Sequence, residues 1–175
     1  MNLWKDTSIG ANPPEEVNLI IEIPKGFRNK IEFDKETGIF KLDRVLHKPF
    51  RFKWNYGFIP QTLYEDGDAA DGLVIMEESL PPGTVVSVRP IGLMKFVDTG
   101  ESDDKLITVA VKDPDYKKVL DIKDLNKKTL NEIKYFFNNY KKAEGKKTEV
   151  KGLESSVVAK DFIMKSIELY KKKFG

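Results

Sequence analysis

Residues 17–45 read VNLIIEIPKGFRNKIEFDKETGIFKLDRV, three short apolar segments separated by two turns. Pro24-Lys25-Gly26 and Thr37-Gly38 are typical turn sequences, because Pro presets φ and Gly tolerates positive φ. Segments of the same kind recur along the chain, and we expect strands at residues 17–23, 31–33, 39–42, 73–76, 84–91 and 105–111. Many short strands with Gly and Pro turns are typical of a barrel or a strongly curled antiparallel sheet.

The last third of the chain has a helical pattern. Apolar residues recur there at three- and four-residue steps, which predicts two amphipathic helices. The two series are Leu130, Ile133, Phe137 and Tyr140, and Val158, Phe162, Ile163, Ile167 and Tyr170. We expect Ser155 or Ser156 at the N-cap of the second helix.

The composition sets limits on the class of protein. No repeat or low-complexity tract divides the 175 residues, so we expect one domain over residues 1–175. Cysteine is absent and His47 is the one histidine, which excludes disulfide scaffolds, thiolate zinc sites and cysteine nucleophiles. The 30 basic and 28 acidic residues leave a net charge of +2, which indicates no bulk attraction to nucleic acid or anionic lipid. Without an apolar leader or membrane-length run, we expect a soluble, cytoplasmic protein.

Two acidic loops are the first functional signal. Residues 65–71 read EDGDAAD, four carboxylates in seven positions directly before the apolar run LVIM. Asp98, Glu101, Asp103 and Asp104 lie before the strand that begins at Lys105. Like charges repel unless cations neutralise them, and hard ions such as Mg²⁺ take carboxylate oxygens. One acidic turn alone is usually an exposed loop, but two of them favour a multi-metal site at one mouth of the barrel.

An EF-hand calcium loop is the alternative for the first acidic loop. Asp66, Asp68 and Glu77 fall at its first, third and twelfth positions. Ala70 occupies the fifth ligand position, and Asp71 replaces the glycine of the sharp turn. Because the flanking segments also read as strands, we reject this alternative.

Basic and phenolic side chains are candidates for binding a polyanion. Arg44 is the strongest of them, because its planar fork binds phosphate oxygens in a bidentate manner, whereas Lys acts as a point charge. The other candidates are Lys30, Lys105, Tyr140 and Lys141. Each is more common as a surface or core residue when it is considered alone.

Together these residues resemble the soluble family I inorganic pyrophosphatases, of the short prokaryotic type. Residues 66–71, DGDAAD, resemble the aspartate signature of that family, and the order and spacing of further motifs extend the match along nearly the whole chain. Those motifs are Ile21-Glu22-Ile23-Pro24, Lys30-Ile31-Glu32, Leu42-Asp43-Arg44, Asn55-Tyr56-Gly57-Phe58-Ile59-Pro60, Arg89-Pro90-Ile91-Gly92, Asp98 with Asp103 and Lys105, Phe136-Phe137 and Tyr140-Lys141.

The resemblance implies a fold and a reaction. The fold is α+β, an OB-like five-stranded antiparallel β-barrel with two main C-terminal helices packed outside. The reaction is the Mg²⁺-dependent hydrolysis of inorganic pyrophosphate to two orthophosphates, by in-line attack of a metal-activated water without a covalent intermediate. Several Mg²⁺ ions act in each active site, with Mn²⁺ as a substitute. The resemblance also implies a cytoplasmic homohexamer with no nucleic-acid or membrane partner.

By matched position, the resemblance also assigns roles to residues. Asp68 is the general base, and the metal ligands are Asp66, Asp71, Asp98, Asp103 and Glu32. Phosphate oxygens are bound by Lys30, Arg44, Tyr56, Lys105, Tyr140 and Lys141, with Glu22 and Asp43 as supporting carboxylates. None of these is a Ser, Cys or His nucleophile, which agrees with direct attack by water.

The chain departs from the family pattern at a few positions. Phe52-Lys53-Trp54 stands where the family usually has Tyr-Pro-x, so a phenol is missing near the expected site. Ala69 replaces a usual Pro, and Thr99 stands where bacterial members often carry an acid. None of these changes removes an expected metal ligand.

Two other functions remain open at this point. OB-like barrels commonly bind single-stranded nucleic acid through stacking aromatics, and aromatic residues alternate with polar ones from Phe50 to Phe58. The acidic loops argue against this alternative, because they repel a phosphate backbone. A degenerate family member that binds without turnover is the second alternative, although every expected ligand position is filled.

Overall fold

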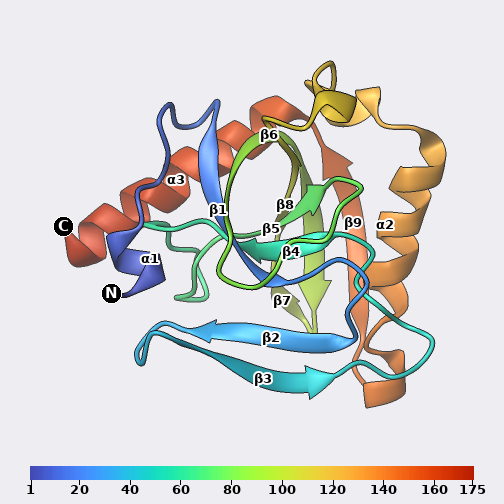
Figure 1. Cartoon of the computed structure of the whole chain (residues 1–175). Helices are drawn as coiled ribbons and strands as arrows, with labels where there is room; N and C mark the ends of the chain where they lie inside the picture. The colour runs from blue at the N-terminus through green and yellow to red at the C-terminus, as the bar shows by residue number, and fades with distance from the viewer.

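Five strands form a closed ring in the computed structural model, which describes residues 1–175 (Figure 1). In ring order they are β1 (Val17–Ile23), β4 (Asn55–Phe58), β5 (Asp71–Ile75), β8 (Lys105–Ala110) and β6 (Val85–Asp98). The pairing of β6 with β1 closes the ring. The six expected strands are confirmed, and β4 is the one strand of the ring that the sequence pattern did not predict.

The ring corrects the expectation of an antiparallel barrel. Four of its pairings are antiparallel, but β5 and β8 run parallel, with Gly72 opposite Leu106. β5 and β8 therefore begin at the same end of the ring. The loops that precede these two strands are the two acidic loops, and the parallel pairing brings both to one mouth of the ring.

A glycine explains why β4 passes close to β1. Gly57 lies opposite Ile21, and a Cβ atom at Gly57 would lie 1.8 Å from the carbonyl oxygen of Ile20. No side chain fits there. The short β4 therefore lacks the alternation that marks a strand in the sequence, although all four of its residues are buried.

A separate hairpin lies below the ring in Figure 1. It consists of β2 (Asn29–Asp34) and β3 (Ile39–Val45), which pair antiparallel with Lys30 opposite Arg44. The hairpin is a two-stranded sheet of its own. It carries Lys30, Glu32, Asp43 and Arg44, so these residues reach the mouth from outside the ring.

The long strand β6 extends beyond the ring, where it pairs with two further strands. These are β7 (Glu101–Ser102) and β9 (Thr148–Glu154), and the sequence pattern predicted neither. β6 turns into β7 through Thr99 and Gly100, which have φ values of 51° and 83°. Consecutive positive φ values match the twist of a tight hairpin, although a β-branched residue is uncommon there.

Two helices cover the ring on different sides, as expected. α2 (Lys127–Asn139) places Ile133, Phe136 and Phe137 in one core, and α3 (Ser156–Phe174) places Ala159, Ile163 and Ile167 in another. β9 lies between the two helices in the sequence. The short elements are α1 (Leu3–Asp6), η1 (Pro114–Tyr116), η2 (Ile122–Asp124) and η3 (Lys142–Glu144). No helix combines the length and the apolar character that a membrane span needs.

Asp121 caps two of these elements at once. Ser155 occupies the N-cap position of α3, as expected, but its side chain makes no capping hydrogen bond. Instead, Asp121 Oδ2 accepts hydrogen bonds from Ser156 N at 2.9 Å and Ser156 Oγ at 2.8 Å, and Oδ1 accepts one from Lys123 N at 3.2 Å. Burial raises the pKa of Asp121, but the hydrogen bonds from Ser156 and Lys123 outweigh it and lower the pKa below its usual value.

We expect Asp121→Ala to lower the free energy of unfolding by about 1 to 2 kcal/mol at pH 7, because a helix cap is lost. The folded pKa of Asp121 is depressed, so this contribution is fully present above the unfolded pKa of about 3.9 and is lost as the pH falls through the folded value. Urea unfolding at pH 7 and pH 3 measures both effects. If the free energies of unfolding of wild type and variant differ by the same amount at both pH values, the assignment of Asp121 as an ionised cap is contradicted.

Candidate active site

One cavity at the acidic mouth collects most of the expected site residues. Its volume is about 160 Å³. The expected residues that line it are Lys30, Glu32, Tyr56, Asp66, Asp68, Asp71, Asp103, Lys105, Tyr140 and Lys141. They come from the hairpin, the ring strands, the two acidic loops and the residues that directly follow α2. The topology thus gathers residues that are more than 100 positions apart in the chain.

The remaining expected residues lie next to this cavity. Glu22 is 6% exposed, accepts a hydrogen bond from Phe33 N at 2.8 Å, and lines an adjoining cavity with Lys30 and Asp71. Asp98 forms an ion pair with Lys141 at a second adjoining cavity. Asp43 lies 3.2 Å from Lys30 Nζ and so connects to the site from the hairpin.

Arg44 lies beside the central cavity rather than in its wall. Its Nη1 donates to Asp43 Oδ2 at 2.7 Å, and its Nε lies 2.6 Å from Glu144 Oε1. Its Nη2 is buried without a hydrogen-bond partner. Arg44 is therefore held beside the cavity by Asp43 and Glu144. Glu144 was not among the expected site residues, because no local sequence signal shows that it pairs with a residue 100 positions earlier.

Lys105 is the centre of a buried polar network. It is 3% exposed, and its Nζ donates to Tyr56 Oη at 2.8 Å and to Asp103 Oδ2 at 3.2 Å. Tyr56 Oη in turn donates to Asp71 Oδ2 at 2.7 Å. Burial lowers the pKa of Lys105, but the charges of Asp103 and Asp71 outweigh it and raise the pKa above its usual value. The ammonium group therefore stays charged in the interior.

The carboxylates at the mouth carry more charge than the local lysines neutralise. Eight carboxylates and five ammonium groups line the central and the two adjoining cavities. Burial, together with the charge of Asp71, raises the pKa of Glu22 to about 8. Burial also raises the pKa of Asp71, and the charge of Asp103 adds to the effect. A cation beside Asp71 would offset its repulsion by Asp103.

The donor set fits divalent cations of the Mg²⁺ type. It consists of carboxylate oxygens, which hard ions prefer, and Asp66 is exposed at the open mouth. No three carboxylates converge on one point in this arrangement, since the Lys105 ammonium lies 3.2 Å from Asp103 and 3.7 Å from Asp71. Entry of a cation therefore requires these side chains to turn toward it.

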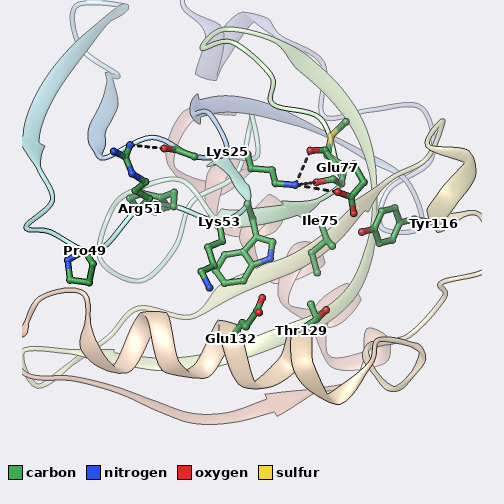
Figure 2. Close-up of a pocket in the computed structure, with 13 residues that line it drawn as sticks. Lys25, Pro49, Arg51, Lys53, Ile75, Glu77, Tyr116, Thr129 and Glu132 are labelled. Atoms are coloured by element: carbon green, nitrogen blue, oxygen red, sulfur yellow. Dashed lines mark hydrogen bonds and ion pairs between the residues drawn. The ribbon is translucent and has the colours of Figure 1, made fainter.

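A larger cavity of about 510 Å³ lies elsewhere (Figure 2). Phe52 lines both this cavity and the central one. Of the carboxylates in the larger cavity, Glu77 lies 3.6 Å from Lys25, and Glu132 comes from α2 (Figure 2). No expected site residue lines it. The acidic mouth is therefore the better candidate for catalysis, although it is the smaller space.

The residues at which the chain departs from the family pattern have defined surroundings in the structure. Phe52 is 2% exposed, and its ring centroid lies 5.5 Å from that of Tyr56. It supplies packing and no hydroxyl group. Thr99 Oγ1 donates to Asp98 Oδ1 at 2.9 Å, and Ala69 is buried.

The burial of the aromatic series removes the basis of the nucleic-acid alternative. Stacking on bases needs exposed ring faces. Phe52, Trp54 and Phe58 are 2%, 4% and 0% exposed. The alternation of aromatic and polar residues in this segment reflects packing in the core.

The fold and the site together define an OB-like barrel whose mouth has carboxylates for divalent cations and ammonium groups for a polyanion. The model of the family described as "Pyrophosphatase: Inorganic pyrophosphatase" matches residues 19–171. The chain belongs to the inorganic pyrophosphatase family. The expected family resemblance is thereby confirmed.

Individual relatives agree with this assignment. The chain is 46% identical to the inorganic pyrophosphatase of Haloferax volcanii, over 100% of this chain and 99% of the relative. It is 42% identical to that of Picrophilus torridus, over 98% and 97% of the two chains. The crystal structure of inorganic pyrophosphatase from Thermus thermophilus superimposes with a TM-score of 0.93 and 39% identity, over 98% of this chain and 99% of that one.

Proposed function

We propose that this chain, an inorganic diphosphatase by family membership, hydrolyses pyrophosphate to two orthophosphates at the acidic mouth with several Mg²⁺ ions. The observation that carries the proposal is the single cavity in which the two acidic loops face Lys30, Lys105 and Lys141. Carboxylates bind the cations, and ammonium groups bind the substrate oxygens. A site with both kinds of group fits a tetravalent anion that arrives with its counterions.

The cations have a defined set of candidate ligands. Asp66, Asp71 and Asp103 would hold the tighter ions, Asp98 and Asp103 would share a further ion, and Glu32 would complete the set. When bound, the cations supply charge neutralisation and lower the pKa of the attacking water. The oxygen-only donor set supports Mg²⁺, with Mn²⁺ as a substitute.

Asp68 is the proton acceptor in this proposal. It lies at the exposed tip of the first acidic loop, where its side chain is 58% exposed, and it lines the central cavity. Its position allows it to take a proton from a water that attacks phosphorus in line. The residues that line this cavity include no serine, cysteine or histidine, which supports direct attack by water without a covalent intermediate.

The phosphate oxygens meet a set of donors from the same network. Lys105 and Tyr56 are buried and hydrogen-bonded to Asp103 and Asp71, so their N–H and O–H groups become available to the substrate when those carboxylates turn toward the cations. Burial raises the pKa of Tyr140, which keeps its hydroxyl neutral and able to donate. Lys30 and Lys141 line the same cavity, and Arg44 beside it would complete the set.

The domain organisation, the oligomeric state and the location of the protein are part of the same proposal. We infer a single domain over residues 1–175 from the undivided sequence, a cytoplasmic location from its lack of an apolar leader or membrane-length run, and a homohexamer from the likeness to short prokaryotic members of the family. Sedimentation velocity of the purified protein tests the hexamer.

Phosphate release from pyrophosphate, assayed with and without Mg²⁺, tests the function. We expect release that depends on Mg²⁺ and stops when a chelator removes the ion. Single-stranded DNA serves as the control ligand, and we expect no binding at physiological salt in the absence of Mg²⁺. A protein that binds pyrophosphate and Mg²⁺ without releasing phosphate would instead be a degenerate member of the family.

A further inference from the structure

Lys35 contacts the proposed proton acceptor, although no motif of the sequence points to it. Its Nζ forms an ion pair with Asp68 Oδ1. Lys35 follows β2 directly, so the contact joins the hairpin to the first acidic loop. The two partners differ in exposure, since the Lys35 side chain is 17% exposed and that of Asp68 is 58% exposed. The lysine is therefore the anchored member of the pair.

Two aromatic rings hold the Lys35 ammonium in place. Nζ lies 5.9 Å from the ring centroid of Trp4 and 5.3 Å from that of Phe58. Both rings are buried, at 5% and 0% exposure. The Trp4 indole is itself fixed, because its Nε1 donates to the carbonyl oxygen of Thr62 at 2.9 Å. Cation–π contacts of this kind orient an ammonium group without neutralising it.

Asp68 has few other restraints. It follows Gly67, which has φ of 86° and open space around its Cβ position. Within the loop, Asp68 Oδ1 accepts a hydrogen bond from the amide of Ala69 at 2.8 Å. The ion pair to Lys35 is the one ion pair or hydrogen bond that joins this carboxylate to another element.

We propose that Lys35 is a positioning residue, which holds the Asp68 carboxylate in the orientation that receives the proton of the attacking water. The proposal rests on the proposed function of Asp68. Burial lowers the pKa of Lys35, but its pairing with Asp68 outweighs it and raises the pKa, so Lys35 stays charged. Because Trp4 and Phe58 hold the Lys35 ammonium in the folded protein, Lys35 can in turn orient the Asp68 carboxylate.

Direct substrate binding is the competing role for Lys35, because it lines a cavity next to the central one with Lys30. The two roles have different kinetic consequences. Loss of a substrate contact raises KM and weakens phosphate binding, whereas loss of positioning lowers kcat alone.

A double-mutant cycle with Lys35→Met and Asp68→Asn tests the proposal. Methionine keeps the hydrocarbon chain between the rings and removes the charge. We expect Lys35→Met to lower kcat by roughly 10- to 100-fold, the range that a misplaced group at a reacting centre produces. KM for pyrophosphate and the affinities for orthophosphate and Mg²⁺ by calorimetry are expected to stay within about twofold. In the Asp68→Asn background, we expect Lys35→Met to change kcat by less than about twofold, since residues that act as a unit are not additive.

Two further variants complete the test. Lys41→Met is the matched control, because Lys41 pairs with Asp34 on the same hairpin outside the cavities, and we expect wild-type kinetics. Lys35→Arg keeps the charge and the ring contacts, and we expect it to retain more than about a third of kcat. If Lys35→Met does not fold, the Lys35→Arg variant provides the test instead. A folded Lys35→Arg protein with less than a tenth of wild-type kcat would then overturn the proposal.

The possible results distinguish a failure of the role proposed for Lys35 from a failure of the role proposed for Asp68. An equal loss from Lys35→Met in both backgrounds shows that Lys35 acts without Asp68 and overturns the inference. A rise in KM with unchanged kcat makes Lys35 a substrate ligand and overturns it as well. If Asp68→Asn alone retains full activity, the role of Asp68 fails first, and the inference fails with it.

Discussion

The Asp68→Asn variant is expected to fold and to bind Mg²⁺, but to lose a factor of about 10² to 10⁴ in the rate of phosphate release, the typical contribution of a general base. The amide has the shape of the carboxylate but does not take up the proton. The exposed position of Asp68 at a loop tip predicts an unchanged melting temperature. Steady-state phosphate release at saturating Mg²⁺, with a melting curve of the same sample, measures both quantities.

The control for this variant is Asp115→Asn. Asp115 is an exposed aspartate in η1, outside all three cavities of the mouth, and we expect wild-type turnover. A value above half of wild-type turnover for Asp68→Asn would remove Asp68 from the mechanism as a proton acceptor.

The second large effect is expected for Asp71→Ala, which should raise the Mg²⁺ concentration for half-maximal activity by roughly 100-fold or more. Changes in the outer shell of metal sites already cost about 10- to 100-fold in affinity. Asp71 also accepts the Tyr56 hydrogen bond and lies 3.7 Å from Lys105, so its loss disturbs the phosphate donors too. Magnesium titrations of activity measure the shift. Mg²⁺ should raise the melting temperature of wild type more than that of the variant, because binding to the native state stabilises it.

Asp66→Ala and Asp103→Ala are expected to shift the Mg²⁺ requirement in the same direction. Glu77→Ala is the matched control, since Glu77 is a carboxylate of the larger cavity and is paired with Lys25 (Figure 2). Its magnesium curve should coincide with that of wild type. If the curves of all three aspartate variants also coincide with wild type, the acidic mouth does not hold the metal.

Local patterns were sufficient for most of the fold. Short apolar segments between Gly and Pro turns predicted β1, β2, β3, β5 and β8 to within a few residues, and the start of β6, which continues seven residues beyond the expected end at residue 91. Helical spacing predicted α2 and α3, because each helix buries one apolar face. β4 and β9 were missed for different reasons. Gly57 interrupts the alternation of apolar and polar residues in β4. β9 is half exposed, so its apolar pattern is weak, and it forms a strand because it pairs with β6.

The sequence by itself determined which chemical groups the protein has: carboxylates in two loops, basic groups beside them and no thiol. Only the tertiary structure decided how these groups meet. The parallel pairing of β5 with β8 brings the two acidic loops to one mouth, and no residue in either strand signals that direction. The contacts of Lys35 with Asp68, and of Arg44 with Glu144, likewise join segments far apart in the chain. Such contacts depend on strand order and ring closure, which arise from the packing of the whole chain and leave no periodic signal in any one segment.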